Sequence, residues 1–62
     1  MEKLIAKPLI KALEEMAVGS TCIAPDGYSE AGVRRACSDL NSRGYYFTTT
    51  RRTGQQLITR LK

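Results

Sequence analysis

The apolar positions of this chain change their spacing along its length, and this change separates helical from extended segments. In the N-terminal part they recur three and four residues apart, as on one face of a helix: Ile5, Leu9, Ala12, Leu13 and Met16. Proline is tolerated in a first helical turn but not deep inside a helix. A helix is therefore predicted over residues 8–17, with residues 1–7 extended or forming a kinked leading turn, and Gly19 is expected to cap its end.

The middle of the chain predicts a short strand, a turn and a second helix. Residues 20–24 contain β-formers, and Pro25-Asp26-Gly27 is a turn signal because proline presets φ and glycine accepts a positive φ. Ser29 is placed to cap a helix over residues 30–43, and Gly44 ends it. The apolar face of this helix again shows spacings of three and four: Val33, Ala36, Cys37 and Leu40.

The C-terminal part predicts a β-hairpin, with strands over residues 45–50 and 56–61. A three-residue loop over residues 52–54 puts glycine at the position that favours a left-handed conformation. The paired residues of one mostly apolar face would then be Tyr45, Phe47, Thr49, Leu57, Thr59 and Leu61. The other face would carry Tyr46, Thr48, Thr50, Ile58 and Arg60. A two-residue loop would place Phe47 opposite Arg60, a poorer pairing, so the three-residue loop is predicted.

These elements give an α+β fold in the order α-β-α-β-β, with a C-terminal β-hairpin. The 62 residues are enough for a single domain, residues 1–62, with one small core. No apolar run approaches the ~20 residues that span a membrane, and lysines interrupt the N-terminal apolar segment, unlike a signal peptide. We therefore expect a cytoplasmic protein without membrane contact.

The charge is distributed unevenly along the chain. Residues 1–26 contain three lysines and four carboxylates, a net charge of −1. Residues 27–62 contain six arginines and one lysine against two carboxylates, a net charge of +5. Arginine forms paired hydrogen bonds to phosphate and to guanine edges, which lysine cannot do. The second part of the chain therefore favours a nucleic-acid partner, although a basic surface can also serve only solubility.

The residue types present argue against catalysis, metal binding and cofactors. The chain has no histidine, no carboxylates paired at a pocket-like spacing and no phosphate-cradling glycine loop, so no catalytic residue is assigned. Cys22 and Cys37 alone are too few for a zinc site. Both are expected to pack as small apolar side chains, Cys37 on the apolar face of its helix.

The stretch VRRACSDLNSRGYYF at residues 33–47 resembles the recognition-helix-to-wing segment of winged helix-turn-helix DNA-binding domains. The resemblance covers about half the chain and has moderate specificity. A full member has a complete helix before the recognition helix, whereas only residues 22–28 separate the predicted strand from Ser29 here, and Pro25-Asp26-Gly27 interrupts them. The chain is then either a minimal winged helix or similar to the second half of that fold only. Small basic winged helices are common among phage and plasmid regulators, which suggests that source.

The resemblance implies sequence-selective binding to double-stranded DNA, by a small transcriptional regulator or an architectural factor of recombination. The recognition helix, residues 29–43, would enter the major groove, and the hairpin tip, residues 51–54, would reach the backbone or a minor groove. The implied DNA-binding residues are Ser29, Arg34, Arg35, Ser38, Arg43, Arg51, Arg52 and Arg60. Single-stranded or RNA binding is a weaker variant, because Tyr46 is the only aromatic expected on an open sheet face.

A protein-binding module is the alternative function. A small phage-type protein of this kind would inhibit or redirect a host protein, and Tyr46 beside Ile58 would anchor the contact. A homodimer through the first helix is also compatible with the sequence, because Leu4, Ile10 and Val18 lie outside its apolar stripe.

Overall fold

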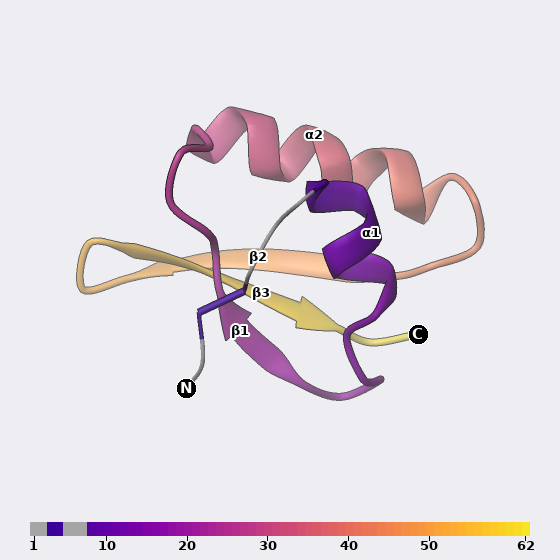
Figure 1. Ribbon diagram of the computed structural model, residues 1–62. Helices are drawn as coiled ribbons and strands as arrows, with labels where there is room; N and C mark the ends of the chain where they lie inside the picture. Colours follow the sequence, from indigo (N-terminus) through magenta and orange to yellow (C-terminus); the bar gives the residue numbers. More distant parts are fainter. Residues whose placement is uncertain (1–2, 5–7) are drawn as a thin grey trace.

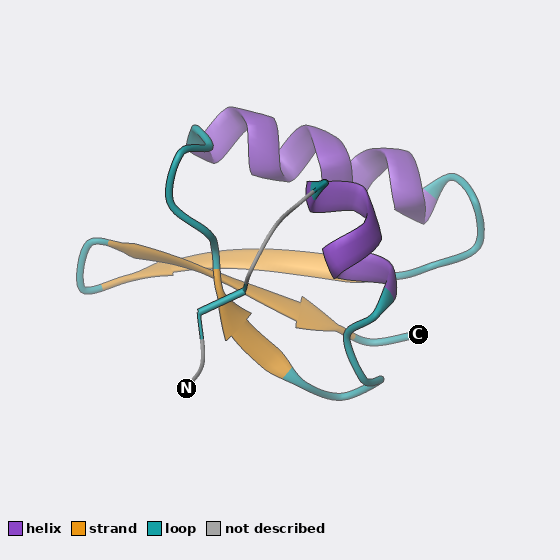
Figure 2. Ribbon diagram, in the orientation of Figure 1, coloured by secondary structure: helices purple, strands orange, loops and turns teal. Residues whose placement is uncertain are grey.

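The computed structural model describes residues 3–4 and 8–62 of the protein. The elements are α1 (Leu9–Glu14), β1 (Thr21–Ile23), α2 (Glu30–Asn41), β2 (Phe47–Arg52) and β3 (Gln55–Arg60). The strands form one antiparallel sheet in the order β1-β3-β2. Both helices lie on the same face of this sheet (Figure 1), and no described helix covers the other face (Figure 2). The protein is a small α+β domain with two described helices and a three-stranded antiparallel sheet.

Helix α1 is shorter than the predicted residues 8–17. It begins after Pro8, whose backbone is extended (φ −78°, ψ 166°), and ends at Glu14 with Glu15 as C-cap. Gly19 does not cap this helix. Its N–H donates to the carbonyl oxygen of Arg60 at 2.6 Å, so Gly19 continues the pairing of β1 with β3. The prediction for the C-terminal end of α1 is therefore wrong, because the chain turns early to enter the sheet.

Residues 3–4 lie along the outer edge of β1. Lys3 forms a parallel bridge with Ile23, and the N–H of Leu4 donates to the carbonyl oxygen of Ile23 at 2.8 Å. The remainder of the expectation for residues 1–7, including Ile5, lies outside the described residues.

Helix α2 confirms the predicted start and apolar face. The Ser29 hydroxyl accepts a hydrogen bond from the N–H of Gly32 at 3.0 Å, as an N-cap does. Val33, Cys37 and Leu40 are buried, so the face read from the sequence is the one that enters the core. The helix ends at Asn41, two residues before the predicted end, and the chain then reverses at Gly44 with a positive φ.

The hairpin has a two-residue loop, so the predicted three-residue loop is wrong. Arg52 pairs with Gln55, and both central residues have positive φ, 48° at Thr53 and 79° at Gly54. Such values are typical of a type I′ turn, whose twist matches that of the flanking strands. Thr53 thus adopts a conformation that is unfavourable for a β-branched residue, and the pairing of the strands compensates for this cost.

The shorter loop reverses the predicted orientation of β3. Phe47 pairs with Arg60, and Thr49 pairs with Ile58. Ile58 and Phe47 therefore point toward the helices, where they are 0% and 3% exposed, whereas Leu57 and Thr59 point away. The predicted exposed pair of Tyr46 and Ile58 is wrong for the same reason. Ile58 lies at the centre of the sheet, since it also pairs with Cys22 of β1.

A single hydrophobic core joins the helices to the sheet. Its buried members are Leu9, Leu13, Met16, Val33, Cys37, Leu40, Phe47 and Ile58. Each secondary-structure element except β1 supplies at least one of these side chains, while Cys22 of β1 packs against the cluster as a partly buried residue. The core therefore fixes both helices against the hairpin.

The side chain of Asn41 bonds to the backbone at the start of β2. Its Nδ2 donates to the Phe47 carbonyl oxygen at 3.1 Å, and its Oδ1 accepts from the Phe47 N–H at 2.7 Å. Strand β2 lies at an edge of the sheet, and the adjacent Tyr46 backbone bonds on the other side to Leu61. The Asn41 amide thus makes the two hydrogen bonds that a neighbouring strand would make.

The turn gives a test of the hairpin geometry. Thr53→Asn is expected to raise the free energy of unfolding by about 1 kcal/mol, because asparagine tolerates a positive φ better than a β-branched residue. Urea-induced unfolding would measure the change. Thr50→Asn is the matched control and should lower stability, because asparagine is unfavourable within a strand. A loss of stability in both variants would contradict the two-residue turn.

Candidate nucleic-acid interface

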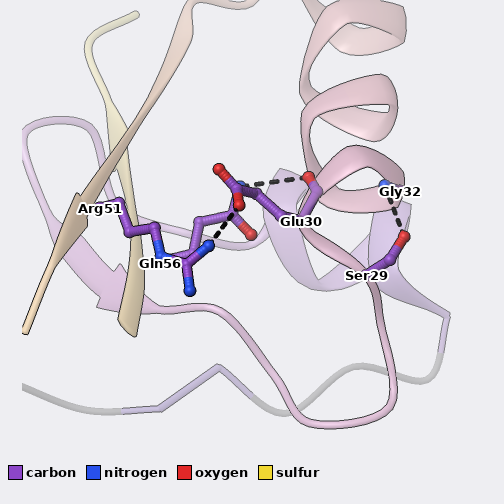
Figure 3. A network of polar contacts seen from close by, with 5 residues as sticks. All are labelled: Ser29, Glu30, Gly32, Arg51 and Gln56. Carbon is purple, nitrogen blue, oxygen red and sulfur yellow. Dashed lines mark hydrogen bonds and ion pairs between the residues drawn. The ribbon is translucent and has the colours of Figure 1, made fainter. Parts of the chain in front are cut away.

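The N-terminus of α2 and the end of the hairpin meet through a small polar network (Figure 3). Arg51 Nη1 donates to Glu30 Oε1 at 2.6 Å. Gln56 Nε2 donates to the backbone carbonyl oxygen of Glu30 at 3.3 Å. The Arg51 and Glu30 side chains are 62% and 40% exposed, and an ion pair so open to solvent contributes only about 0–1 kcal/mol. Its main consequence is geometric, because it holds the hairpin beside the first turn of α2.

The exposed side of α2 carries Arg34, Arg35 and Ser38, but the two arginines lie on different flanks. Residues four apart are neighbours on a helix, so Arg34 lies between Glu30 and Ser38, on the flank that faces β2. Arg35 lines a groove of about 620 Å³ between α2 and α1, together with Ile10 of α1. Both guanidinium groups are exposed, and no ion pair of either is found within residues 3–4 and 8–62.

Arg51 and Arg52 also point in different directions. Successive side chains of a strand alternate between its faces, so Arg51 faces the helices, where it meets Glu30. Arg52 lies on the face of the sheet that neither described helix covers, and it lines a hollow together with Thr21 and Leu57. The two arginines predicted at one tip therefore serve two different surfaces, and only Arg51 contacts α2.

The remaining predicted residues lie farther from this junction. Arg43 follows α2 and forms an ion pair with Asp39 at 3.1 Å, about 20 Å along the helix axis from Ser29. Arg43 is exposed but is directed to its own helix. The structure thus brings Ser29, Arg34 and Arg51 to one end of the molecule and leaves Arg43 at the other end of α2.

Arg60 makes internal contacts instead of joining the exposed arginines. Its Nη1 donates to the carbonyl oxygens of Glu14 at 3.0 Å and Met16 at 2.6 Å. Its guanidinium carbon lies 5.1 Å from the centre of the Tyr45 ring and 5.9 Å from that of Phe47. The group satisfies carbonyls at the C-terminal end of α1 and stacks on aromatic rings, which explains why arginine is acceptable opposite Phe47.

Sequence reasoning missed three residues that organise this region: Glu30, Asn41 and Gln56. Glu30 was not predicted to contact the hairpin, although its spacing of four residues from Arg34 places both on one flank of α2. Asn41 occupies the same flank, which could have indicated a contact with the following strand. No sequence signal identifies Gln56, because its role depends on the register of the hairpin.

The cysteines do not take part in the candidate site. Cys37 is buried in the core, and burial raises the pKa of its thiol. The neutral thiol is therefore favoured at Cys37, in keeping with a packing role.

Comparisons with known proteins give no family for this chain. No protein-family model matches it, and no match is found among curated proteins or solved structures. Within the part of the chain that the structure describes, no helix combines the length and the apolar character needed to cross a membrane.

The position of Arg60 gives a test of its structural role. Arg60→Lys retains the charge but cannot reproduce two guanidinium hydrogen bonds and the ring contacts. We expect it to lower the free energy of unfolding by about 1–3 kcal/mol in chemical denaturation. The control Arg43→Lys changes an exposed ion pair and should alter stability by less than about 1 kcal/mol. Equal effects of the two substitutions would contradict the internal role of Arg60.

Proposed function

We propose that the protein binds double-stranded DNA through α2 and the β2–β3 hairpin, as a small transcriptional regulator or a recombination or architectural factor. The proposal is supported by the resemblance of residues 33–47 to winged helix-turn-helix domains and by the net charge of +5 on residues 27–62. An α-helix with its side chains is about 10–12 Å wide, which matches the ~12 Å width of the major groove.

The observation that carries the proposal is the junction of Glu30, Arg51 and Gln56. These contacts hold the hairpin against the first turn of α2, so that Arg34 and Arg51 come from separate elements but share one flank. A duplex placed along this flank would meet guanidinium groups from both elements.

All the predicted residues except Arg60 have a role in this arrangement. Arg34, Arg35 and Ser38 would approach base edges or nearby phosphates from α2, and the amides that follow Ser29 would meet a phosphate at the helix N-terminus. Arg51 would reach the phosphate backbone. Arg52 and Arg43 would have weaker roles, because Arg52 would contact the duplex only from the hairpin end and Arg43 would add only to the positive electrostatic potential around the DNA. Arg60 is left out, because its guanidinium group donates to backbone carbonyls within the protein.

A protein-binding module is a second candidate, favoured by exposed side chains at the opposite end of the hairpin. Tyr46 and Leu61 are 52% and 49% exposed, and the N–H of Leu61 donates to the Tyr46 carbonyl oxygen at 2.7 Å. Aromatic residues with aliphatic neighbours anchor many protein interfaces. Capture of one host protein, together with no DNA binding at moderate salt, would favour this function.

Binding to random duplex DNA across a salt series tests the main proposal. Affinity should fall steeply with salt, and Arg34→Ala and Arg51→Ala should each reduce the slope of log K against log salt by about 0.9, the value for one phosphate contact. Lys11→Ala removes the same charge from the exposed side of α1 and is the control. A salt-independent affinity, or equal effects of all three substitutions, would contradict the proposed surface.

Sequence preference separates contacts with bases from contacts with the backbone. Arg35→Ala is expected to relax discrimination among selected sites by about 1–3 kcal/mol, whereas Arg52→Ala should weaken binding to all sequences alike. Fluorescence anisotropy with a selected site and a scrambled site would measure both effects. Unchanged discrimination in Arg35→Ala would remove Arg35 from base recognition.

A further inference from the structure

The open face of the sheet carries rows of hydroxyl and aliphatic side chains. One row crosses all three strands through Thr21, Thr59 and Thr48, because Thr59 pairs with the other two. The next row toward the loop contains Leu57 of β3 and Thr50 of β2. These side chains point away from the helices, so the core does not explain why four threonines and a leucine are grouped there.

Part of this face is a hollow of about 260 Å³. Its lining consists of Thr21, Thr50, Arg52, Leu57 and Thr59. The only charged side chain in the lining is Arg52, and no ion pair of Arg52 is present among residues 3–4 and 8–62. A cation without a carboxylate partner at an open polar hollow favours an anion there.

The hydroxyl groups supply further hydrogen-bond donors. Thr21 Oγ1 and Thr59 Oγ1 are 2.9 Å apart, so one of their two hydrogens is shared between them and the other can be donated to a ligand. The hydroxyl of Thr50 makes no side-chain hydrogen bond to another described residue and can be donated as well. With the two parallel N–H groups of a guanidinium, these hydroxyls give the hollow the kinds of donor that the oxygens of a tetrahedral anion accept.

We propose that this hollow is a binding site for a phosphate group, free or as a small phosphate ester. Arg52 pairs with two phosphate oxygens, and the hydroxyls of Thr50 and of the Thr21–Thr59 pair donate to the others. Leu57 provides an apolar surface for the organic part of an ester. The hollow lies on the face of the hairpin opposite to Arg51, and Arg52 is the one lining residue that it shares with the proposed DNA surface.

The test is a titration of ¹⁵N-labelled protein followed by two-dimensional NMR at constant ionic strength. Inorganic phosphate, thymidine 5′-monophosphate and thymidine are the three ligands. Phosphate is expected to cause saturable shifts at the amides of Thr50, Arg52, Leu57 and Thr59, and thymidine none. Saturation by the monophosphate identifies an ester site, whereas saturation by phosphate alone identifies a free-anion site. Shifts that do not saturate, or that centre on α2, would overturn the proposal.

Substitutions then separate a built site from general attraction by positive charge. Arg52→Gln should weaken binding at least about tenfold, the loss expected for charge-assisted hydrogen bonds. Lys11→Gln removes the same charge from the exposed side of α1 and should leave the affinity unchanged. Thr50→Val should weaken binding and Thr50→Ser should restore it, and the spectrum of each variant reports whether it is folded. Equal losses in Arg52→Gln and Lys11→Gln, or no loss in Thr50→Val, would overturn the site.

Discussion

The register of the β2–β3 hairpin is the constraint on which the other features of this structure depend. The two positive φ angles at Thr53 and Gly54 close a two-residue turn, and that turn sends Ile58 toward the helices. Burying one such side chain contributes about 1.5–3 kcal/mol, a large part of the ~3–9 kcal/mol expected for a domain of this size. A slip of β3 by one residue would expose Ile58, turn Leu57 inward and withdraw Arg60 from α1.

The sequence predicted those elements whose signals are local. The serine cap and the spacing of Val33, Cys37 and Leu40 were sufficient for α2, because capping and amphipathic burial act within the helix itself. The hairpin register could not be obtained in this way. Arg60 opposite Phe47 was judged unfavourable as an isolated pair, and its acceptors, the carbonyls of Glu14 and Met16, become visible only when α1 is placed on the sheet.

The candidate site was predictable in its residue types but less so in its grouping. Adjacent arginines suggest one basic cluster in a linear sequence, yet Arg34 and Arg35 lie on different flanks of α2, and Arg51 and Arg52 on different faces of the hairpin. Helical and strand geometry both separate neighbouring side chains. The two pairs of consecutive arginines therefore contribute to different surfaces of this protein: the flank of α2 for which we propose DNA binding, and the hollow on the open face of the sheet for which we propose a phosphate site.

The amide of Asn41 has a consequence for the behaviour of the protein at high concentration. An uncovered strand at a sheet margin is a template for adding strands from other molecules, which leads to fibrous aggregates. Asn41 already occupies the outward backbone groups of Phe47, so only those of Thr49 and Arg51 remain along β2. Arg51 is the one of these two residues that lies nearer the hairpin tip, and it is positively charged in every copy of the protein. Like charges would therefore meet if the β2 edges of two molecules approached each other. One side chain from the preceding helix thus limits self-assembly without the need for a fourth strand.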